Sequence, residues 1–378
     1  MKVKNLPKQG KAISRKNMEN LTLNQKTLEK PERQSGIELL RIFAMLIIVF
    51  HHAFMYGVYD RSNPAYHYIF DILQLGGKLG VNIFVIISAY FMVGKKFKLT
   101  RILTLWLTTL FYALIFFIIN LFIGDVTLTG VFKSFFPVFS DHYWFITTYV
   151  LLMFVSPALN IVIKTIPQKK FKIGLLVLVP MLILYRLVAR MFWLERDFPA
   201  LTPFIWFIVL YFIAAYIKLY GIKIKKQILL LALIIVTIFQ IVFTKFDRVE
   251  IGYCWTIGNT LLAILYFLIF KDFNFRSKFV NTTASTMVGV YLIHGNFYAF
   301  RWCWRDFVGV FEGFISNPVL AVSLCAICVF IICILIDLVR VKTIHKLNIK
   351  LMQKIDKKLE EKSQKKIAED NKEAENQL

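Results

Sequence analysis

Ten long apolar runs follow one another along the chain, and short polar segments separate them. A helix needs about 20 apolar residues to cross a hydrocarbon core of about 30 Å, and several of these runs reach that length. Alternation of apolar and polar positions, which marks a membrane β-strand, is weak. The pattern therefore predicts an all-α protein, a polytopic integral membrane helical bundle with about ten transmembrane helices. The helices are expected near residues 37–57, 78–93, 102–123, 143–163, 173–190, 203–220, 227–244, 252–270, 286–303 and 318–339.

Composition and charge refine this picture. Hydrophobic residues make up 58% of the chain and the mean hydropathy is +0.62, whereas soluble domains are about 45–50% apolar. A net charge of +23 would suggest nucleic acid as the partner of a soluble chain, but 35 of the 46 Lys and Arg residues lie in alternate segments that include both termini, against six in the opposite loops. Positive charge concentrates on the cytoplasmic side. We expect a multi-pass protein of the cell (plasma) membrane with both termini cytoplasmic and no nucleic-acid partner.

The apolar runs divide the chain into three parts. Residues 1–36 form a basic cytoplasmic segment, residues 37–340 the transmembrane domain, and residues 341–378 a Lys/Glu-rich cytoplasmic tail. Apolar residues recur in the tail at helical spacing, so it is expected either to lie on the anionic inner leaflet or to be a solvated helix that frays.

The first apolar run holds four polar groups. Eleven helical steps separate Arg41 from His52, so the two side chains share a face and lie about 16 Å apart along the axis. Glu38 is three residues before Arg41, at a spacing where an ion pair lowers the cost of burying both charges. His51 points about 80° away from this face and is the weaker candidate.

Ionisable groups inside a membrane are costly, which favours a functional role for them. A structural role is the alternative, in which Glu38 and Arg41 reach the inner interface and His52 hydrogen-bonds a neighbouring helix. That alternative gives no reason for an arginine and a histidine on one face.

Several segments resemble the transmembrane acyltransferase-3 family. Its first helix carries an acidic residue, an arginine three positions later and a histidine after ten more, which Glu38, Arg41 and His52 match in IELLRIFAMLIIVFHH. Further similarity lies in LGVNIFVIISAYFM (79–92), HYWFITTYVLLMFVSPALN (142–160) and GVYLIHGNF (289–297), so the likeness covers about residues 36–340.

Two departures from the family pattern are visible. Ser88 is followed by Ala89 where many members have Ser-Gly, and Tyr149 stands where some branches have a glutamate five residues after the tryptophan. The chain therefore resembles a branch of the family without this glutamate.

The resemblance implies an O-acyltransferase that moves an acyl group, usually acetyl, from cytoplasmic acyl-CoA to a hydroxyl of a cell-surface glycan or lipid-linked sugar. His52 is expected to act as the base or to carry the acyl group covalently. Arg41 would meet a coenzyme A phosphate, or instead serve as the structural partner of Glu38. The basic inner loop is expected to attract the donor phosphates or simply to follow the positive-inside bias; it comprises Lys95, Lys96, Lys98 and Arg101.

By resemblance, four further residues are expected to line the acceptor pocket: Ser88, Tyr143, Trp144 and His294. Trp144 is equally consistent with an interfacial anchor. Arg186 and Arg190, one turn apart, either line an acceptor path or extend toward the interface. Other histidines, His67, His142 and His345, show no metal-ligand spacing, and no metal is expected.

Two other functions remain open at this point. A proton-coupled transporter or glycan flippase could use buried His, Arg and Glu as a relay, although paired broken helices are not evident. A catalytically dead scaffold with a recruiting tail is the third. The acceptor glycan, the choice of acetyl or succinyl, covalent or direct transfer, and the oligomeric state are left open. Cys325 and Cys328 lack neighbouring ligands and are expected to be inert, buried thiols.

Overall fold

The structure is a computed structural model, which describes residues 33–57, 64–124, 126–140, 143–191, 201–244, 257–344, 348–358, 361–362 and 369. These residues form helices and connecting loops, with no strand among them, so the all-α prediction is confirmed. His142, His345, Cys254 and most of the basic N-terminal segment lie outside the described residues, as do the side chains of Arg186 and Arg190. The helices are α2 Ser35–Tyr56, α3 Pro64–Gln74, α4 Gly76–Met92, α5 Leu99–Ile123, α6 Leu128–Phe135, α7 Trp144–Thr165, α8 Gln168–Met191, α9 Leu201–Tyr220, α10 Lys226–Thr244, α12 Ile257–Phe270, α13 Lys278–Ala284, α14 Met287–His294, α15 Ala299–Arg301, α16 Phe307–Phe314 and α17 Pro318–Lys342, with a π-helical turn η2 Trp302–Asp306.

Seven helical segments in the described ranges are long and apolar enough to cross a membrane. They account for seven of the ten predicted runs. Of the other three, 173–190 lies within α8, the described part of 252–270 forms the apolar helix α12, and 286–303 is interrupted. The number ten and the side on which the termini lie stay predictions. The seven segments are Ser35–Tyr56, Tyr66–Met92, Leu99–Ile123, Trp144–Thr165, Pro203–Tyr220, Lys226–Thr244 and Pro318–Lys342.

The helix predicted at residues 78–93 is longer in the structure. Helices α3 and α4 follow each other almost without a break, so the segment extends over Tyr66–Met92. Its first half contains Asp71 and Gln74, whose polarity conceals the apolar pattern. These residues face the cavity described below.

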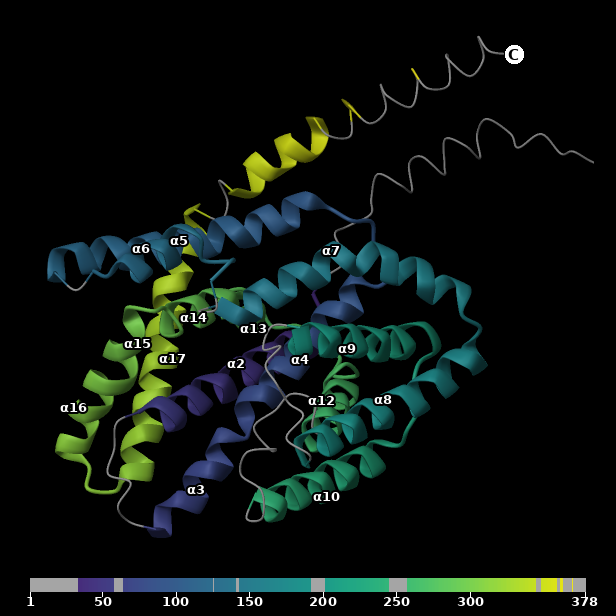
Figure 1. The fold of residues 1–378 in the computed structure, drawn as a ribbon, viewed down its shortest axis with the longest axis horizontal. Coiled ribbons are helices and arrows are strands. Elements are labelled where there is room, and N and C mark those ends of the chain that lie inside the picture. Colours follow the sequence, from purple (N-terminus) through teal and green to yellow (C-terminus); the bar gives the residue numbers. More distant parts are fainter. Residues whose placement is uncertain are drawn as a thin grey trace, which may run out of the picture.

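Helices α2 and α4 form the centre of the bundle (Figure 1). Helix α4 also packs against α9 and α12, whereas α2 packs against α13, α14 and α17. Glycines allow the close approach of the central pair: a Cβ atom at Gly80 would come within 2.6 Å of the Ala44 carbonyl oxygen, and one at Gly77 would overlap the His51 imidazole. The approach puts the first turn of α4 level with the histidines of α2.

The predicted helix at 286–303 is divided after His294. Helix α14 ends there, Gly295 follows as its C-cap, and the Asn296 side chain accepts a hydrogen bond from the Tyr298 backbone N–H at 2.9 Å. The chain then resumes through α15 and η2. This break, which hydropathy does not indicate, sets the position of His294.

Helix α10 indicates which surfaces of the bundle face lipid. Only 17% of its most apolar window is buried, although the mean hydropathy of that window is 2.5. Large apolar side chains such as Ile234, Ile238 and Val242 are exposed along it. A helix this apolar with so little protein around it is expected to contact the hydrocarbon core directly.

One end of α17 carries a buried ion pair that the apolar pattern of the sequence does not predict. Arg340 binds Asp337 through two hydrogen bonds, of 2.6 and 3.0 Å, and Tyr112 donates a third to Asp337 at 2.6 Å. Asp337 has no exposed surface and also packs on Gly289. The group therefore joins α5, α14 and α17.

Candidate active site

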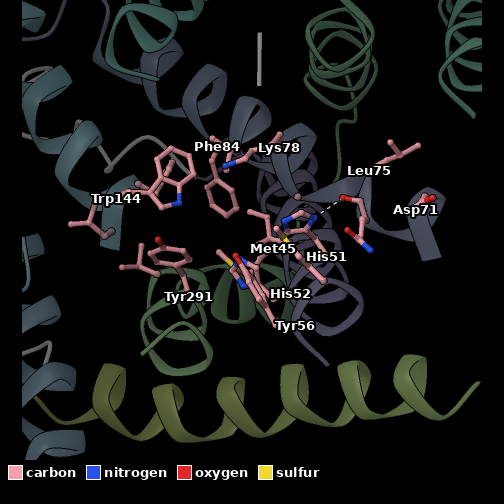
Figure 2. A pocket seen from close by; sticks show the side chains of 18 of the residues that line it. Met45, His51, His52, Tyr56, Asp71, Leu75, Lys78, Phe84, Trp144 and Tyr291 are labelled. Carbon is pink, nitrogen blue, oxygen red and sulfur yellow. Dashed lines mark hydrogen bonds between the residues drawn. The ribbon is translucent and has the colours of Figure 1, made fainter. Parts of the chain in front are cut away.

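A cavity of about 460 Å³ opens between α2, α4, α7 and α14. Its α2 wall contains Met45, Ile48 and His52, which recur at helical spacing. Arg41 lies on the same face of α2, one turn before Met45. The shared face predicted for Arg41 and His52 therefore follows one wall of the cavity. Figure 2 shows Met45, His52, Phe84, Trp144 and Tyr291 grouped around the cavity. The remaining lining residues are His51, Met55, Tyr56, Asp71, Gln74, Leu75, Gly77, Lys78, Val81, Phe84, Trp144, Phe145, Ile146, Thr244, Val288 and Tyr291.

His52 is hydrogen-bonded to a second histidine. His52 Nδ1 lies 2.9 Å from Nε2 of His294, and Nδ1 of His294 lies 2.6 Å from the Val290 carbonyl oxygen. A carbonyl oxygen only accepts, so His294 Nδ1 carries the proton. In the neutral pair His294 Nε2 then accepts from His52 Nδ1–H, which makes Nε2 the basic nitrogen of His52.

His294 itself lies behind the cavity wall. Its side chain has no exposed surface, and it is not among the residues that line the cavity. The Trp304 indole donates a hydrogen bond to the His294 carbonyl at 3.2 Å, and the Trp304 ring meets the His294 ring edge-on at 5.8 Å. The structure thus places His294 beside His52 and away from the space that a substrate could occupy.

Tyr143 also supports this region from behind. Its hydroxyl donates to the Leu292 carbonyl at 2.9 Å and accepts from the Asn296 amide at 2.9 Å. Tyr143 is 1% exposed and is absent from the cavity wall. It therefore holds the end of α14, next to the break that positions His294.

His51 reaches the same cavity as His52. Its Nδ1 lies 2.6 Å from the Gln74 carbonyl oxygen, so this nitrogen carries the proton and the ring is fixed against the end of α3. His51 and His52 are adjacent in α2, so their side chains point about 100° apart around the helix axis. The cavity is broad enough for both to line it. The two histidines differ in what holds them: a backbone carbonyl for His51 and a second imidazole for His52.

Lys78 and Trp144 meet on the opposite side of the cavity. The Lys78 ammonium lies 4.1 Å from the centroid of the Trp144 ring, and both residues line the cavity (Figure 2). Of the four predicted pocket residues, only Trp144 lines this cavity. Lys78 was not predicted, because a single lysine at a helix rim is expected to extend toward the interface.

A second group of polar residues lies at the Arg41 end of α2. Arg41 Nη1 and Glu38 Oε2 are 2.6 Å apart, as their spacing predicted, and Glu38 is buried while the Arg41 side chain is 23% exposed. The Tyr149 hydroxyl is hydrogen-bonded to Ser88 and lies within electrostatic range of Arg41 and Arg101. Ser88 therefore belongs with Arg41 and not with the histidines.

The basic inner loop is exposed, with Lys95, Lys96, Lys98 and Arg101 all accessible to solvent. Part of it contacts the C-terminal tail: Asp356 accepts a hydrogen bond from Thr100 at 2.8 Å and lies 3.5 Å from the Lys98 ammonium. Arg101 lies close enough to Tyr149 for its charge to act on that hydroxyl, which also lies near Arg41. Lys95 and Lys96 lie exposed between α4 and α5.

The described part of the chain contains no cluster of three or more His, Cys, Asp or Glu side chains arranged to hold a metal ion. Cys303, Cys325, Cys328 and Cys333 are all free thiols, and Cys325 and Cys333 are buried.

A comparison with protein families matches residues 34–338 to the acyltransferase domain of the acyltransferase-3 family. The matched region contains α2 through most of α17, and so includes the cavity and both polar groups. No match was found among curated proteins or among solved structures. The chain therefore belongs to the acyltransferase-3 family and is a multi-pass membrane acyltransferase.

Proposed function

We propose that this protein is a membrane O-acyltransferase that transfers an acyl group, most simply acetyl, from cytoplasmic acyl-CoA to a hydroxyl of a cell-surface glycan or lipid-linked sugar. The observation that carries the proposal is the His52–His294 pair, in which His52 lines the cavity and His294 lies behind it, with a hydrogen bond of 2.9 Å between the rings. A base held by a second group within hydrogen-bond distance is the arrangement that acyl transfer to a hydroxyl requires.

His52 Nε2 takes the proton from the acceptor hydroxyl while the hydroxyl oxygen attacks the thioester carbonyl carbon. A carbon–oxygen bond forms and the carbon–sulfur bond breaks, and His52 returns the proton to the departing thiolate. His294 accepts the Nδ1–H of His52 throughout, which keeps the ring in the reactive tautomer and stabilises the imidazolium that forms. In this direct transfer no acyl group is carried by His52.

The donor end of the site is assigned to Arg41, supported by its partly exposed side chain. The planar fork of an arginine binds phosphate through two hydrogen bonds, and Glu38 holds one side of that fork. Arg101 adds a second positive charge near Tyr149. Arg41 lies about 16 Å from His52 along α2, a separation that the pantetheine arm of coenzyme A is long enough to bridge.

The acceptor is assigned to the histidine end of the cavity. The bias of Lys and Arg residues puts the N-terminus inside, so α2 runs outward and His52 falls in the outer half of the membrane. An acceptor glycan would then enter from outside and present its hydroxyl to His52. Trp144 and Tyr291 supply aromatic surface in the wall for the sugar.

Proton NMR of surface glycans tests the proposal. A deletion strain is complemented with the wild-type gene, with His52→Ala or with no gene, and membrane abundance of each protein is measured. O-acyl signals are expected only with the wild type. Absence of any gene-dependent O-acyl signal from surface glycans and lipid-linked sugars, with the wild-type protein present in the membrane, would contradict it.

A further inference from the structure

We propose that the acceptor carries an acidic group, a carboxylate or a phosphate, on or next to the sugar that is acylated, and that Lys78 binds this group. The inference deepens the function proposed above and rests on it. It starts from a positive charge in the cavity wall, to which the transfer chemistry assigns no role.

The packing of α4 on α2 sets the height of Lys78 in the bundle. Gly77 lies against the His51 ring, so the next residue along α4 is level with the histidines and not with Arg41. Lys78 lines the same cavity as His52 (Figure 2). A group bound by Lys78 would therefore accompany the acceptor hydroxyl, whereas the donor phosphates would bind at the opposite end of α2.

Lys78 has no carboxylate partner in the described ranges. No Asp or Glu oxygen of those ranges lies within 4.0 Å of its ammonium, and Figure 2 shows Asp71, the acidic residue of the cavity wall, well apart from Lys78 beyond Leu75. A cation in an apolar wall is expected to be paired or to serve a ligand. Its neighbour is instead the Trp144 ring, 4.1 Å away.

The negative face of the Trp144 ring takes the place of an anion beside the Lys78 ammonium. A cation–π contact is weaker than a charge-assisted hydrogen bond, so an acidic ligand that enters the cavity would draw the ammonium from the ring. The same movement uncovers the Trp144 face for the sugar. One lysine therefore couples recognition of the acid to exposure of the aromatic surface.

The test uses the full-length protein in a deletion strain that expresses wild type, Lys78→Gln, Lys78→Arg or Lys133→Gln. Lys133→Gln is the matched control, because the Lys133 ammonium also lies over an aromatic ring, 4.8 Å from that of Phe297, but lines no part of the cavity. Glycan bearing the gene-dependent ester is purified, and NMR and mass spectrometry locate any acidic group near the ester.

The ester is expected on, or one sugar from, a residue that carries a carboxylate or phosphate. At equal membrane abundance, Lys78→Gln should reduce ester content at least tenfold, whereas Lys78→Arg should retain much of it and Lys133→Gln should be unchanged. A wild-type ester on a neutral glycan overturns the inference and leaves the proposed function intact, even if Lys78→Gln fails to accumulate. Unchanged ester in Lys78→Gln also overturns it. Absence of every gene-dependent ester instead contradicts the proposed function.

Discussion

His52 and His294 are hydrogen-bonded across 242 residues of sequence, with 2.9 Å between Nδ1 of the first and Nε2 of the second. The first lies in α2, near the start of the family domain, and the second ends α14, close to its last helix. Their pairing makes the reactive tautomer of His52 depend on the Val290 carbonyl, which fixes the proton on His294. The base is thus assembled only when both ends of the domain have packed together.

His294→Leu should lower kcat by roughly 10²- to 10⁴-fold, because His52 loses the acceptor of its Nδ1–H and both tautomers become populated. KM for the acceptor should change little, since His294 does not line the cavity. His294→Gln, whose amide oxygen can accept the same hydrogen bond, should recover part of kcat. Steady-state kinetics of the reconstituted protein check this; a raised acceptor KM with normal kcat would mean that His294 contacts substrate.

Arg41→Ala should raise KM for acyl-CoA about tenfold or more, the effect of losing a charge-assisted hydrogen bond of about 1.5–3 kcal/mol. Arg41→Lys keeps the charge that pairs with Glu38 but loses the planar fork, so it should fold well and still bind the donor weakly. The exposed Lys96 provides the control, and Lys96→Ala should change the donor KM less. Equal effects at both positions would favour a general electrostatic attraction over a specific phosphate contact.

Gly77→Ala should destabilise the bundle by about 1–3 kcal/mol, because the new methyl group overlaps the His51 ring and forces α2 and α4 apart. Gly174→Ala in α8 is the matched control, since nothing lies within 4 Å of its Cβ position and alanine favours a helix. Thermal unfolding in detergent measures both. Similar melting temperatures for Gly77→Ala and wild type would contradict the close packing of the two central helices.

Asp337→Asn should destabilise the protein by about 3–5 kcal/mol, because it leaves the Arg340 guanidinium buried without its carboxylate. The double variant Asp337→Leu, Arg340→Met removes both charges and should recover much of the loss. Thermal unfolding provides the measurement. Acyl transfer that fails in the double variant despite normal stability would assign the pair a catalytic role beyond joining α5, α14 and α17.

Helix-scale patterns made the membrane class and the Glu38–Arg41 pair predictable. Burial in lipid requires apolar runs of fixed length, and an ion pair three residues apart depends on one helix only. The shared face of Arg41 and His52 followed from the same periodicity. These features depend on residues within a single helix, so they can be predicted from the spacing of residues in the sequence.

Contacts between distant segments could not be predicted in this way. The partner of His52 depends on where α14 ends, which Gly295 and the Asn296 side chain decide through local hydrogen bonds invisible to hydropathy. Similarly, Lys78 is a rim residue by sequence but a cavity residue in space, because Gly77 brings α4 against His51. Ser88 and Tyr143 were expected at the acceptor pocket, and neither lines this cavity: Ser88 is hydrogen-bonded to Tyr149, and Tyr143 to the Leu292 carbonyl.

Transfer of labelled acetyl from acetyl-CoA to glycan in inside-out membrane vesicles tests the role of His52 most directly, with hydroxylamine-sensitive label counted as ester. Wild-type vesicles are compared with His52→Ala and His51→Ala vesicles at equal protein abundance. His52→Ala should lose transfer by roughly 10²- to 10⁴-fold, as removal of a general base does, and His51→Ala should lose less. Transfer by His52→Ala at the wild-type rate, or equal losses in both variants, would contradict the assignment of His52 as the base.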